Sequence, residues 1–253
     1  MPNLPLRSYG WRRDLPDYRD RVLTAGAPRQ NLPARIDLRE LCPPVYDQLS
    51  LGSCTANAIA AAIEFDQRKQ GLERFMPSRL FLYYNERAME GTTAADAGAT
   101  LRDGMRSINR AGVCAETLWP YEEPLVLQSP GSACYEAARS HRSVYYAHVP
   151  QTTAYMKTCL ADGFPFVFGI SVYESFESDA VASSGDVPMP AAKESLLGGH
   201  ALLAVGYDDA AGRFLVRNSW GTGWGQAGYC TMPYEYLQDH GLTGDLWTLR
   251  IMS

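Results

Sequence analysis

Apolar and polar positions divide the chain into two parts with different periodicity. Between about residues 53 and 122, apolar side chains recur at helical spacing and predict helices over 55–69, 77–89 and 99–110. Beyond about residue 143, short apolar runs separated by turn residues predict strands at 143–148, 164–173, 201–207, 214–217 and 228–232. The pattern therefore predicts an α+β protein in which a helical half precedes a β-rich half.

Composition narrows the class of protein without identifying it. The 253 residues are 46% hydrophobic with a net charge of −5, so bulk charge gives no reason to expect nucleic-acid binding. The sequence has no 18-residue apolar stretch, and we expect no membrane partner. The N-terminus lacks the long apolar run of a secretory signal, which leaves a cytoplasmic location or export by another route.

The six cysteines are too few and too scattered for a disulfide scaffold, and none forms a Cys-x-x-Cys pair. We expect no metal site and no organic cofactor, and most cysteines should be small buried hydrophobes. Cys54 differs because it precedes the alanine-rich run 56–63, which favours a helix. Backbone N–H groups at a helix start favour thiolate over thiol, so we expect a lowered pKa for Cys54. A lone cysteine in this position is nevertheless more often structural than catalytic.

Three other polar residues complete a candidate catalytic group. Gln48, six residues before Cys54, offers a side-chain donor that with the Cys54 backbone N–H would form an oxyanion hole. Among four histidines, His200 is the best-placed base, because two glycines open the apolar strand in which it stands. Asn218 ends the next strand, and its amide oxygen would hold the imidazole in one tautomer.

With these residues the chain resembles the papain family (clan CA) of cysteine peptidases, nearest to its compact bacterial branch. The resemblance covers about residues 33 to 250, and its most specific motif is Asn218-Ser-Trp-Gly-Thr-Gly-Trp-Gly-Gln-Ala-Gly-Tyr229. It implies a papain-like two-subdomain fold, with a helical half, an antiparallel β-barrel-like half and the active-site cleft between them. The corresponding divisions are an N-terminal basic, pro-like segment at 1–32, a helical subdomain at 33–142 and a β-rich subdomain at 143–253.

The resemblance also implies roles for individual residues. Cys54 would be the nucleophile, His200 the general acid/base, and Asn218 the orienting residue, while Gln48 would be the oxyanion donor. Trp220 would shield the hydrogen bond between His200 and Asn218, and Trp224 would line the leaving-group side of the cleft. The residues expected to contact substrate are Gly52, Gly98, Trp220 and Trp224.

Several positions depart from the family pattern. Thr55 stands where plant and animal members usually carry tryptophan, and Gly199 where an aspartate or asparagine commonly precedes the histidine. Leu51 replaces a cysteine that forms a structural disulfide in those members, so that bridge cannot form here. The glycine pair that usually binds substrate backbone is reduced to the segment 96–99, in which Gly98 remains.

Residues 1–32, which we call the leader, carry a net charge of +3, whereas the rest of the chain carries −8. The two parts should attract each other, and prolines at positions 2, 5, 16 and 28 keep the leader extended. Tyr9, Trp11 and Tyr18 can anchor it in apolar grooves. The leader resembles a short pro-segment that occupies the cleft, and the alternative is that it merely packs on the surface.

The sequence therefore predicts a cysteine peptidase that hydrolyses peptide bonds through a thioester on Cys54 and is gated by its leader. Its expected partners are peptide or protein substrates and its own N-terminal segment. One alternative is an acyl-transferring or isopeptide-cleaving enzyme with the same triad. Another is a binding module on an inactive scaffold, against which the intact Gln48, Cys54, His200 and Asn218 argue.

Overall fold

The computed structural model describes residues 8–23, 28–29, 31–142 and 144–251. Predictions for the leader that fall on residues 1–7, 24–27 and 30 lie outside this part of the chain. Within the described ranges, no helix is both long and apolar enough to cross a membrane.

Three helices form the first half of the fold, as the periodicity predicts: α1 (Cys54–Gln70), α2 (Arg79–Glu90) and α3 (Leu101–Ala111). Side-chain caps start two of them, since Ser78 accepts from the Phe81 N–H and Thr100 from the Asp103 N–H. Gly71 ends α1 in the left-handed conformation. The sequence did not predict the short elements α4 (Ser132–Ala138), η1 (Arg39–Leu41), η2 (Glu123–Leu125) and η3 (Arg139–His141).

The second half is an antiparallel sheet with the strand order β2-β7-β3-β4-β5-β6, and β1 also pairs with β4. The strands are β1 (Arg35–Asp37), β2 (Val144–His148), β3 (Phe166–Tyr173), β4 (Leu196–Asp208), β5 (Arg213–Arg217), β6 (Tyr229–Pro233) and β7 (Thr243–Ile251). The papain-like fold is confirmed, but the barrel-like closure is not. Among the residues that the structure describes, the sheet is open, because β2 and β6 form its two ends and pair with only one strand each.

Strand β4 is longer than predicted and begins at Leu196, so His200 lies inside the strand instead of near its start. Two glycines before the histidine disfavour a strand by propensity. Pairing with β3 overrides that preference, since Ile170 is opposite His200 and Ser171 opposite Gly199. His200 is thereby fixed on a central strand of the sheet.

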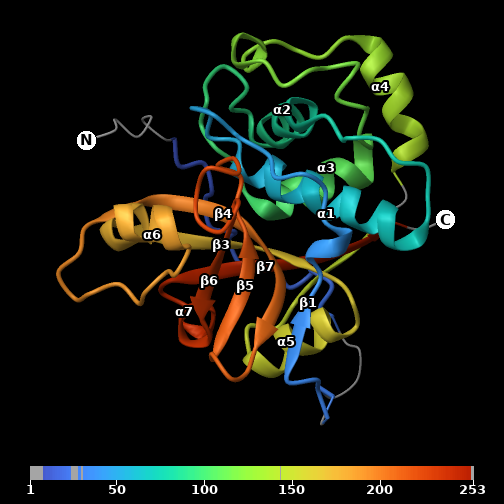
Figure 1. Ribbon diagram of the computed structural model, residues 1–253. Coiled ribbons are helices and arrows are strands. Elements are labelled where there is room, and N and C mark those ends of the chain that lie inside the picture. Colours follow the sequence, from blue (N-terminus) through green and yellow to red (C-terminus); the bar gives the residue numbers. More distant parts are fainter. Residues whose placement is uncertain (1–7, 24–27, 30, 143, 252–253) are drawn as a thin grey trace.

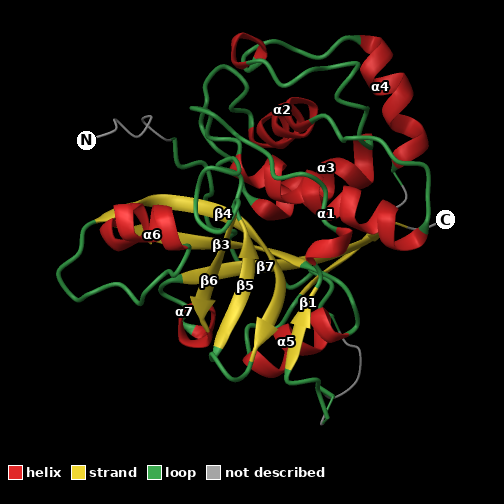
Figure 2. Cartoon of the chain, in the orientation of Figure 1, coloured by secondary structure: helices red, strands yellow, loops and turns green. Residues whose placement is uncertain are grey.

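The sheet separates two hydrophobic cores, and the helices pack in two layers (Figures 1 and 2). Helix α1 packs its alanine-rich face against the β4 residues Ala201, Leu203 and Val205. On the opposite face lie the remaining helical elements, α5 (Thr153–Ala161), α6 (Asp179–Ser184), α7 (Tyr234–Gln238) and η4 (Glu174–Glu177). The first residue of α1 therefore faces β4 at the junction of the two halves.

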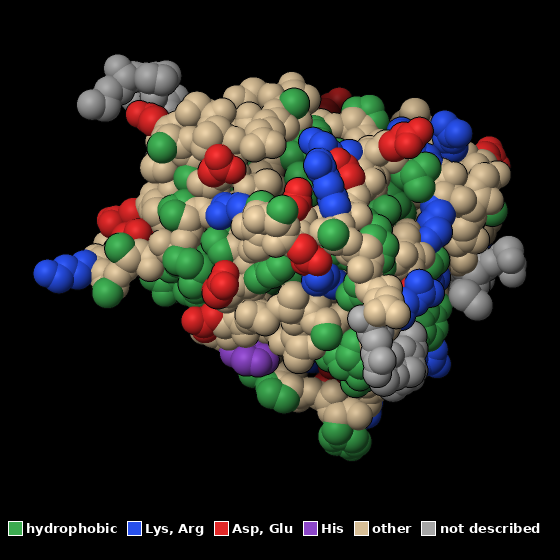
Figure 3. All heavy atoms as spheres, turned by 60° about the horizontal axis from the view of Figure 1, so that its bottom comes forward, with side chains coloured by type: hydrophobic (Ala, Val, Ile, Leu, Met, Phe, Trp, Pro, Cys, Tyr) green, Lys and Arg blue, Asp and Glu red, His purple; other side chains and the backbone are tan. Residues whose placement is uncertain are grey.

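Charged side chains are mixed on the surface. On the face shown in Figure 3, basic and acidic groups are interspersed and do not gather into a patch of one sign.

Candidate active site

Cys54 is the first residue of α1 and is fully buried. Burial raises the pKa of its thiol to about 11, and hydrogen bonds from the backbone N–H groups of Ala201 and Gly10 act in the lowering direction. The contact with the Ala201 N–H places the sulfur at the peptide bond that follows His200 on β4. The sequence predicted a lowered pKa at this helix start. Here the opposite shift results, because leader and body together exclude water from the sulfur.

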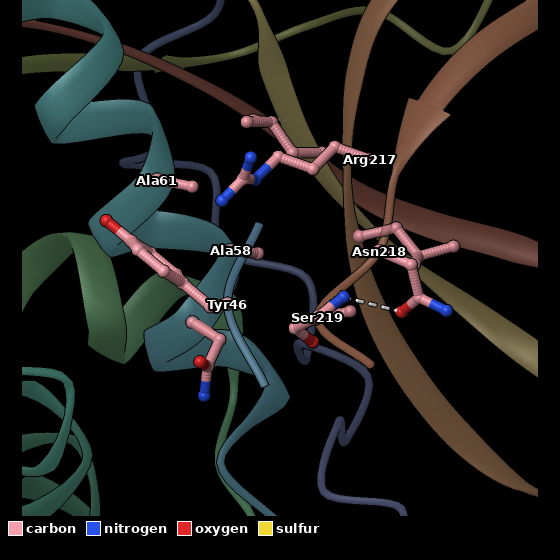
Figure 4. Close-up of a pocket in the computed structure, with 10 residues that line it drawn as sticks. Tyr46, Ala58, Ala61, Arg217, Asn218 and Ser219 are labelled. Atoms are coloured by element: carbon pink, nitrogen blue, oxygen red, sulfur yellow. Dashed lines mark hydrogen bonds between the residues drawn. The ribbon is translucent and has the colours of Figure 1, made fainter. Parts of the chain in front are cut away.

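His200 lies inside β4, and Asn218 directly follows the end of β5. The two side chains lie side by side because these strands pair. The His200 Nε2 is 2.8 Å from the Asn218 Oδ1, and both side chains are buried. The same oxygen accepts a 2.8 Å hydrogen bond from the Ser219 N–H, which fixes the orientation of the amide (Figure 4). An amide oxygen facing Nε2 favours the tautomer that carries its proton there, so Nδ1 is the nitrogen with acceptor capacity.

Gln48 is held against the same segment. Its backbone N–H donates to the Ser219 carbonyl at 2.9 Å, and its Oε1 accepts from the Ser219 hydroxyl at 2.7 Å. Its Nε2 donates to the Leu51 carbonyl at 2.9 Å, which places the amide nitrogen beside the loop that leads into Cys54. Ser219 thus orients both Asn218 and Gln48, a role that sequence reasoning missed because the two segments are far apart in the chain.

Arg217 joins the loop before Gln48 to the end of β5. Figure 4 shows its side chain reaching from β5 toward α1 in a cavity that Tyr46, Ala58 and Ala61 also line. Its guanidinium donates to the carbonyl oxygens of Pro43 at 2.6 Å and Pro44 at 2.5 Å. This buried cation fixes the chain that carries Gln48 next to the strand that carries Asn218.

The two tryptophans of the asparagine motif occupy different positions. Trp220 stacks on the His200 ring, with centroids 4.8 Å apart and an interplanar angle of 28°. It can therefore exclude water from the hydrogen bond between His200 and Asn218. Trp224 packs edge-on against Trp220 at 5.2 Å and lies at a 31° tilt against Phe176 at 5.6 Å, and only 4% of it is exposed. Its contacts support Trp220 from behind.

The leader runs through the space between the two halves (Figure 1). The Trp11 N–H donates to the Gly199 carbonyl at 2.9 Å, and the Arg12 N–H donates to the Ala99 carbonyl at 3.0 Å. In return, the Ala99 N–H donates to the Gly10 carbonyl at 2.7 Å. The leader backbone is thus hydrogen-bonded to both walls, on either side of Cys54.

Glycines make this close approach possible. A Cβ built on Gly98 would lie 2.1 Å from the Gly10 carbonyl oxygen, and one on Gly199 would lie 2.3 Å from the Trp11 carbonyl oxygen. A Cβ on Gly169 would lie 1.9 Å from the Trp11 indole. These walls can therefore accept an extended backbone only because they lack side chains at these positions.

Side chains of the leader also contact the body. The Trp11 Nε1 and the Asp14 backbone N–H both donate to the Asp245 Oδ2, at 3.0 and 2.7 Å. The Trp247 Nε1 donates to the Asp14 Oδ2 at 3.0 Å. Burial, followed by the charge of Asp245, raises the pKa of Asp14 to about 7, and burial also raises the pKa of Asp245. Two acidic side chains thus share a partly dehydrated contact between leader and sheet.

The predicted residues converge on this region, except for Trp224. Gly52 and Gly98 both contact Gly10, the Cys54 sulfur accepts from the Gly10 N–H, and Gly199, next to His200, contacts Trp11. Asn218 is joined to this group through His200, and Gln48 is joined to Asn218 through Ser219. Sequence reasoning missed the role of Asp96, which accepts from the Gly52 N–H at 2.9 Å. Asp96 stands in the segment that departs from the family pattern, and that departure was the one available signal.

Comparison with known proteins gives a consistent result. The family model described as papain family cysteine protease matches residues 32–245. Xylellain, a cysteine protease from Xylella fastidiosa, is 39% identical with a TM-score of 0.90, over 100% of this chain and 99% of that one. This agrees with the predicted likeness to the bacterial branch that xylellain typifies.

Two other relatives agree. An uncharacterised peptidase C1-like protein of Acanthamoeba polyphaga mimivirus is 40% identical over 96% of this chain and 87% of its own length. The procathepsin L 3 structure from Tenebrio molitor shares the fold at 18% identity and a TM-score of 0.70, over 97% of this chain and 76% of that one. The chain belongs to the papain family of cysteine proteases.

Proposed function

We propose that this protease cleaves peptide bonds with Cys54 as nucleophile, His200 as general acid/base, and Asn218 as the residue that orients His200. The observation that carries the proposal is the 2.8 Å contact between His200 Nε2 and Asn218 Oδ1, beside a cysteine that starts a helix. With Nε2 engaged by Asn218, Nδ1 is the nitrogen that exchanges a proton with the Cys54 sulfur.

The reaction then follows from these positions. The Cys54 sulfur attacks the peptide carbonyl carbon, and negative charge develops on the oxygen beside the Cys54 backbone N–H and the Gln48 amide. As the C–N bond breaks, His200 gives its proton to the departing amine and leaves a thioester on Cys54. His200 next takes a proton from water, which attacks the thioester, and the thiol and the carboxylic acid are released.

In the second part of the proposal, the leader gates the cleft. Residues 10–12 are hydrogen-bonded to both walls, and the Gly10 N–H points at the Cys54 sulfur. A productive substrate must present a carbonyl carbon there, so the leader occupies the cleft without being positioned for cleavage. Because the leader is part of the same chain, it competes with substrate at a high effective concentration.

Two variants of the full chain test the triad. Cys54→Ala should abolish turnover of a mixed peptide pool and remove the site of alkylation, which peptide mapping by mass spectrometry locates. Cys159→Ala is the matched control, because Cys159 is equally buried but lies in α5, on the other face of the sheet. Peptidase activity retained in purified Cys54→Ala protein would overturn the mechanism. Turnover of amide conjugates but not of peptides would favour the isopeptide-cleaving alternative.

A further inference from the structure

Two segments must keep their places for a papain-like site to work, and they come from different parts of the helical half. One is the loop at 48–53, which delivers Gln48 and Cys54. The other is the pair Gly98 and Ala99, which we call the rim, because Ala99 forms hydrogen bonds with an extended backbone in the cleft. With Leu51 in place of the cysteine of plant and animal members, no disulfide can tie the loop down at that position.

Asp96 connects the loop to the rim. Its carboxylate accepts the Gly52 N–H through both oxygens, at 2.9 Å to Oδ2 and 3.2 Å to Oδ1. Gly52 also lies against the leader, since a Cβ built on it would be 3.5 Å from the Gly10 Cα. Asp96 therefore holds the loop at Gly52, two residues before the nucleophile. At this residue the loop also contacts the segment that occupies the cleft. A carboxylate that accepts a backbone N–H makes a stronger bond than a neutral acceptor does.

Tyr83 on α2 joins the rim to the same carboxylate. Its hydroxyl donates to the Asp96 Oδ1 and accepts the Gly98 N–H at 2.9 Å. Burial, followed by the hydrogen bond with Asp96, raises the pKa of Tyr83 far above its ordinary value. The phenol therefore remains a donor throughout the working pH range. A single hydroxyl thus couples the rim to the carboxylate that holds the loop.

Arg87, one turn further along α2, fixes the chain that carries Asp96. It is fully buried, its Nη1 donates to the Ala95 carbonyl at 2.7 Å, and its guanidinium lies 4.1 Å from the centroid of the Tyr83 ring. The chain on both sides of Asp96 is therefore anchored to the same face of α2. A carboxylate held in this way has one orientation toward Gly52, although much of the Asp96 residue is exposed.

We propose that Asp96 and Tyr83 are positioning residues of this protease, which replace the missing disulfide by a hydrogen-bonded bridge from the nucleophile loop to the rim. The inference rests on the proposed role of Cys54. It assigns Tyr83 directly to the rim and to the loop only through Asp96, whereas Asp96 holds the loop itself and also anchors the Tyr83 hydroxyl. The two residues should therefore have separable kinetic effects.

The experiment compares kcat and KM, normalised to active sites titrated with a thiol-directed inhibitor, on a peptide long enough to pair with the rim. Tyr83→Phe should raise KM several-fold with kcat nearly unchanged. Asp96→Ala should lower kcat as well as raise KM, with a loss in kcat/KM of about ten-fold or more, the order expected for one charge-assisted hydrogen bond. Asp96→Asn keeps an acceptor for the Gly52 N–H and should stay within a few-fold of the unsubstituted protein.

Tyr84→Phe is the matched control, because it removes a hydroxyl from the next residue of α2, outside the bridge. Each variant is measured again in a Gly10→Ala background, where the leader no longer competes for the rim. The proposal is overturned if Asp96→Ala lowers only the melting temperature or the titrated fraction, with kcat and KM per active site unchanged. If Cys54→Ala retains activity, the proposed function fails instead, whatever the Asp96 and Tyr83 variants show.

Discussion

Gly10 approaches Gly52 so closely that a Cβ built on Gly10 would lie 1.6 Å from the Gly52 carbonyl oxygen. Real side chains do not reach such distances, so one of the two segments must move if Gly10 gains a methyl group. The loop at Gly52 is held by Asp96 and continues into α1, whose residues fill the core. The leader is held here by backbone hydrogen bonds of residues 10–12 and by the contacts of Trp11 and Asp14 with the sheet. It is less firmly fixed than the loop and is the part that should leave.

We therefore expect Gly10→Ala to open the site. Alkylation of Cys54 and turnover of small peptides should both rise by about ten-fold or more, because a clash of this size exceeds what a few backbone hydrogen bonds offset. Leu15→Ala serves as the control, since Leu15 is 81% exposed. Equal labelling rates in Gly10→Ala and the unsubstituted protein would show that the leader does not cover the sulfur in solution.

A second prediction concerns the pH dependence of that labelling. With the leader in place, burial raises the pKa of Cys54 to about 11, so little thiolate is present at neutral pH. Once the leader leaves, water and the start of α1 favour the thiolate again, and the midpoint of the alkylation profile should shift to lower pH. The measurement is the rate of iodoacetamide labelling from pH 5 to 10 in the full chain and in Gly10→Ala. Identical midpoints in the two proteins would show that the leader does not cause the raised pKa of Cys54.

Docking of the leader should itself depend on pH through Asp14. Its pKa rises from 3.8 to about 7 on docking, so the docked state holds a proton that the released state gives up. Docking is therefore most favourable below about pH 4 and weakens as the pH rises toward 7. The titratable and charged groups around this contact are Arg13, Asp17, Tyr18, Asp20, Arg102, His148, His240 and Asp245.

A dye on Tyr18→Cys in a Cys54→Ala background can report this release, since Tyr18 is 99% exposed. The anisotropy of the dye should fall as the pH rises from 4 to 8, and Asp14→Asn should flatten the change. A leader that instead dissociates as the solution is acidified would contradict the assigned role of Asp14.

The predicted and observed elements differ for physical reasons. The strong helical periodicity predicts a helix over 55–69, and α1 spans Cys54–Gln70. Each predicted end is therefore within one residue of the observed end. Strand β7 was missed because Gly244 and Asp245 interrupt its apolar pattern, and Asp245 has a φ of 55°. Helix α5 was not predicted, because a helix of nine residues has too few helical turns to give a clear periodic pattern of apolar residues. Long periodic segments can be predicted from the sequence, whereas short helices and strands depend on their tertiary contacts.

The residues of the candidate site also divide into those that can be predicted from the sequence and those that depend on tertiary contacts. Cys54, Gln48, His200 and Asn218 could be chosen from residue type and local position, because each requires a particular functional group. Ser219 and Asp96 could not, because a serine or an aspartate acts here only through partners 171 and 44 residues away in the chain. The position of the leader was inferred from its charge and aromatic residues, but the glycines that admit it become meaningful only once both walls are in place.

The last prediction separates Gln48 from the residue that holds it. Removal of one oxyanion donor costs about 10²- to 10³-fold in kcat, so Gln48→Ala should lower kcat by that order with little change in KM. Ser219→Ala removes the hydroxyl that donates to Gln48 Oε1 but leaves the Ser219 N–H on Asn218 and the backbone pairing with Gln48 intact. It should therefore cause a smaller loss of the same kind, and almost none when added to Gln48→Ala. Additive losses in the double variant would mean that Ser219 acts independently, while an effect of Gln48→Ala confined to KM would remove Gln48 from the oxyanion hole.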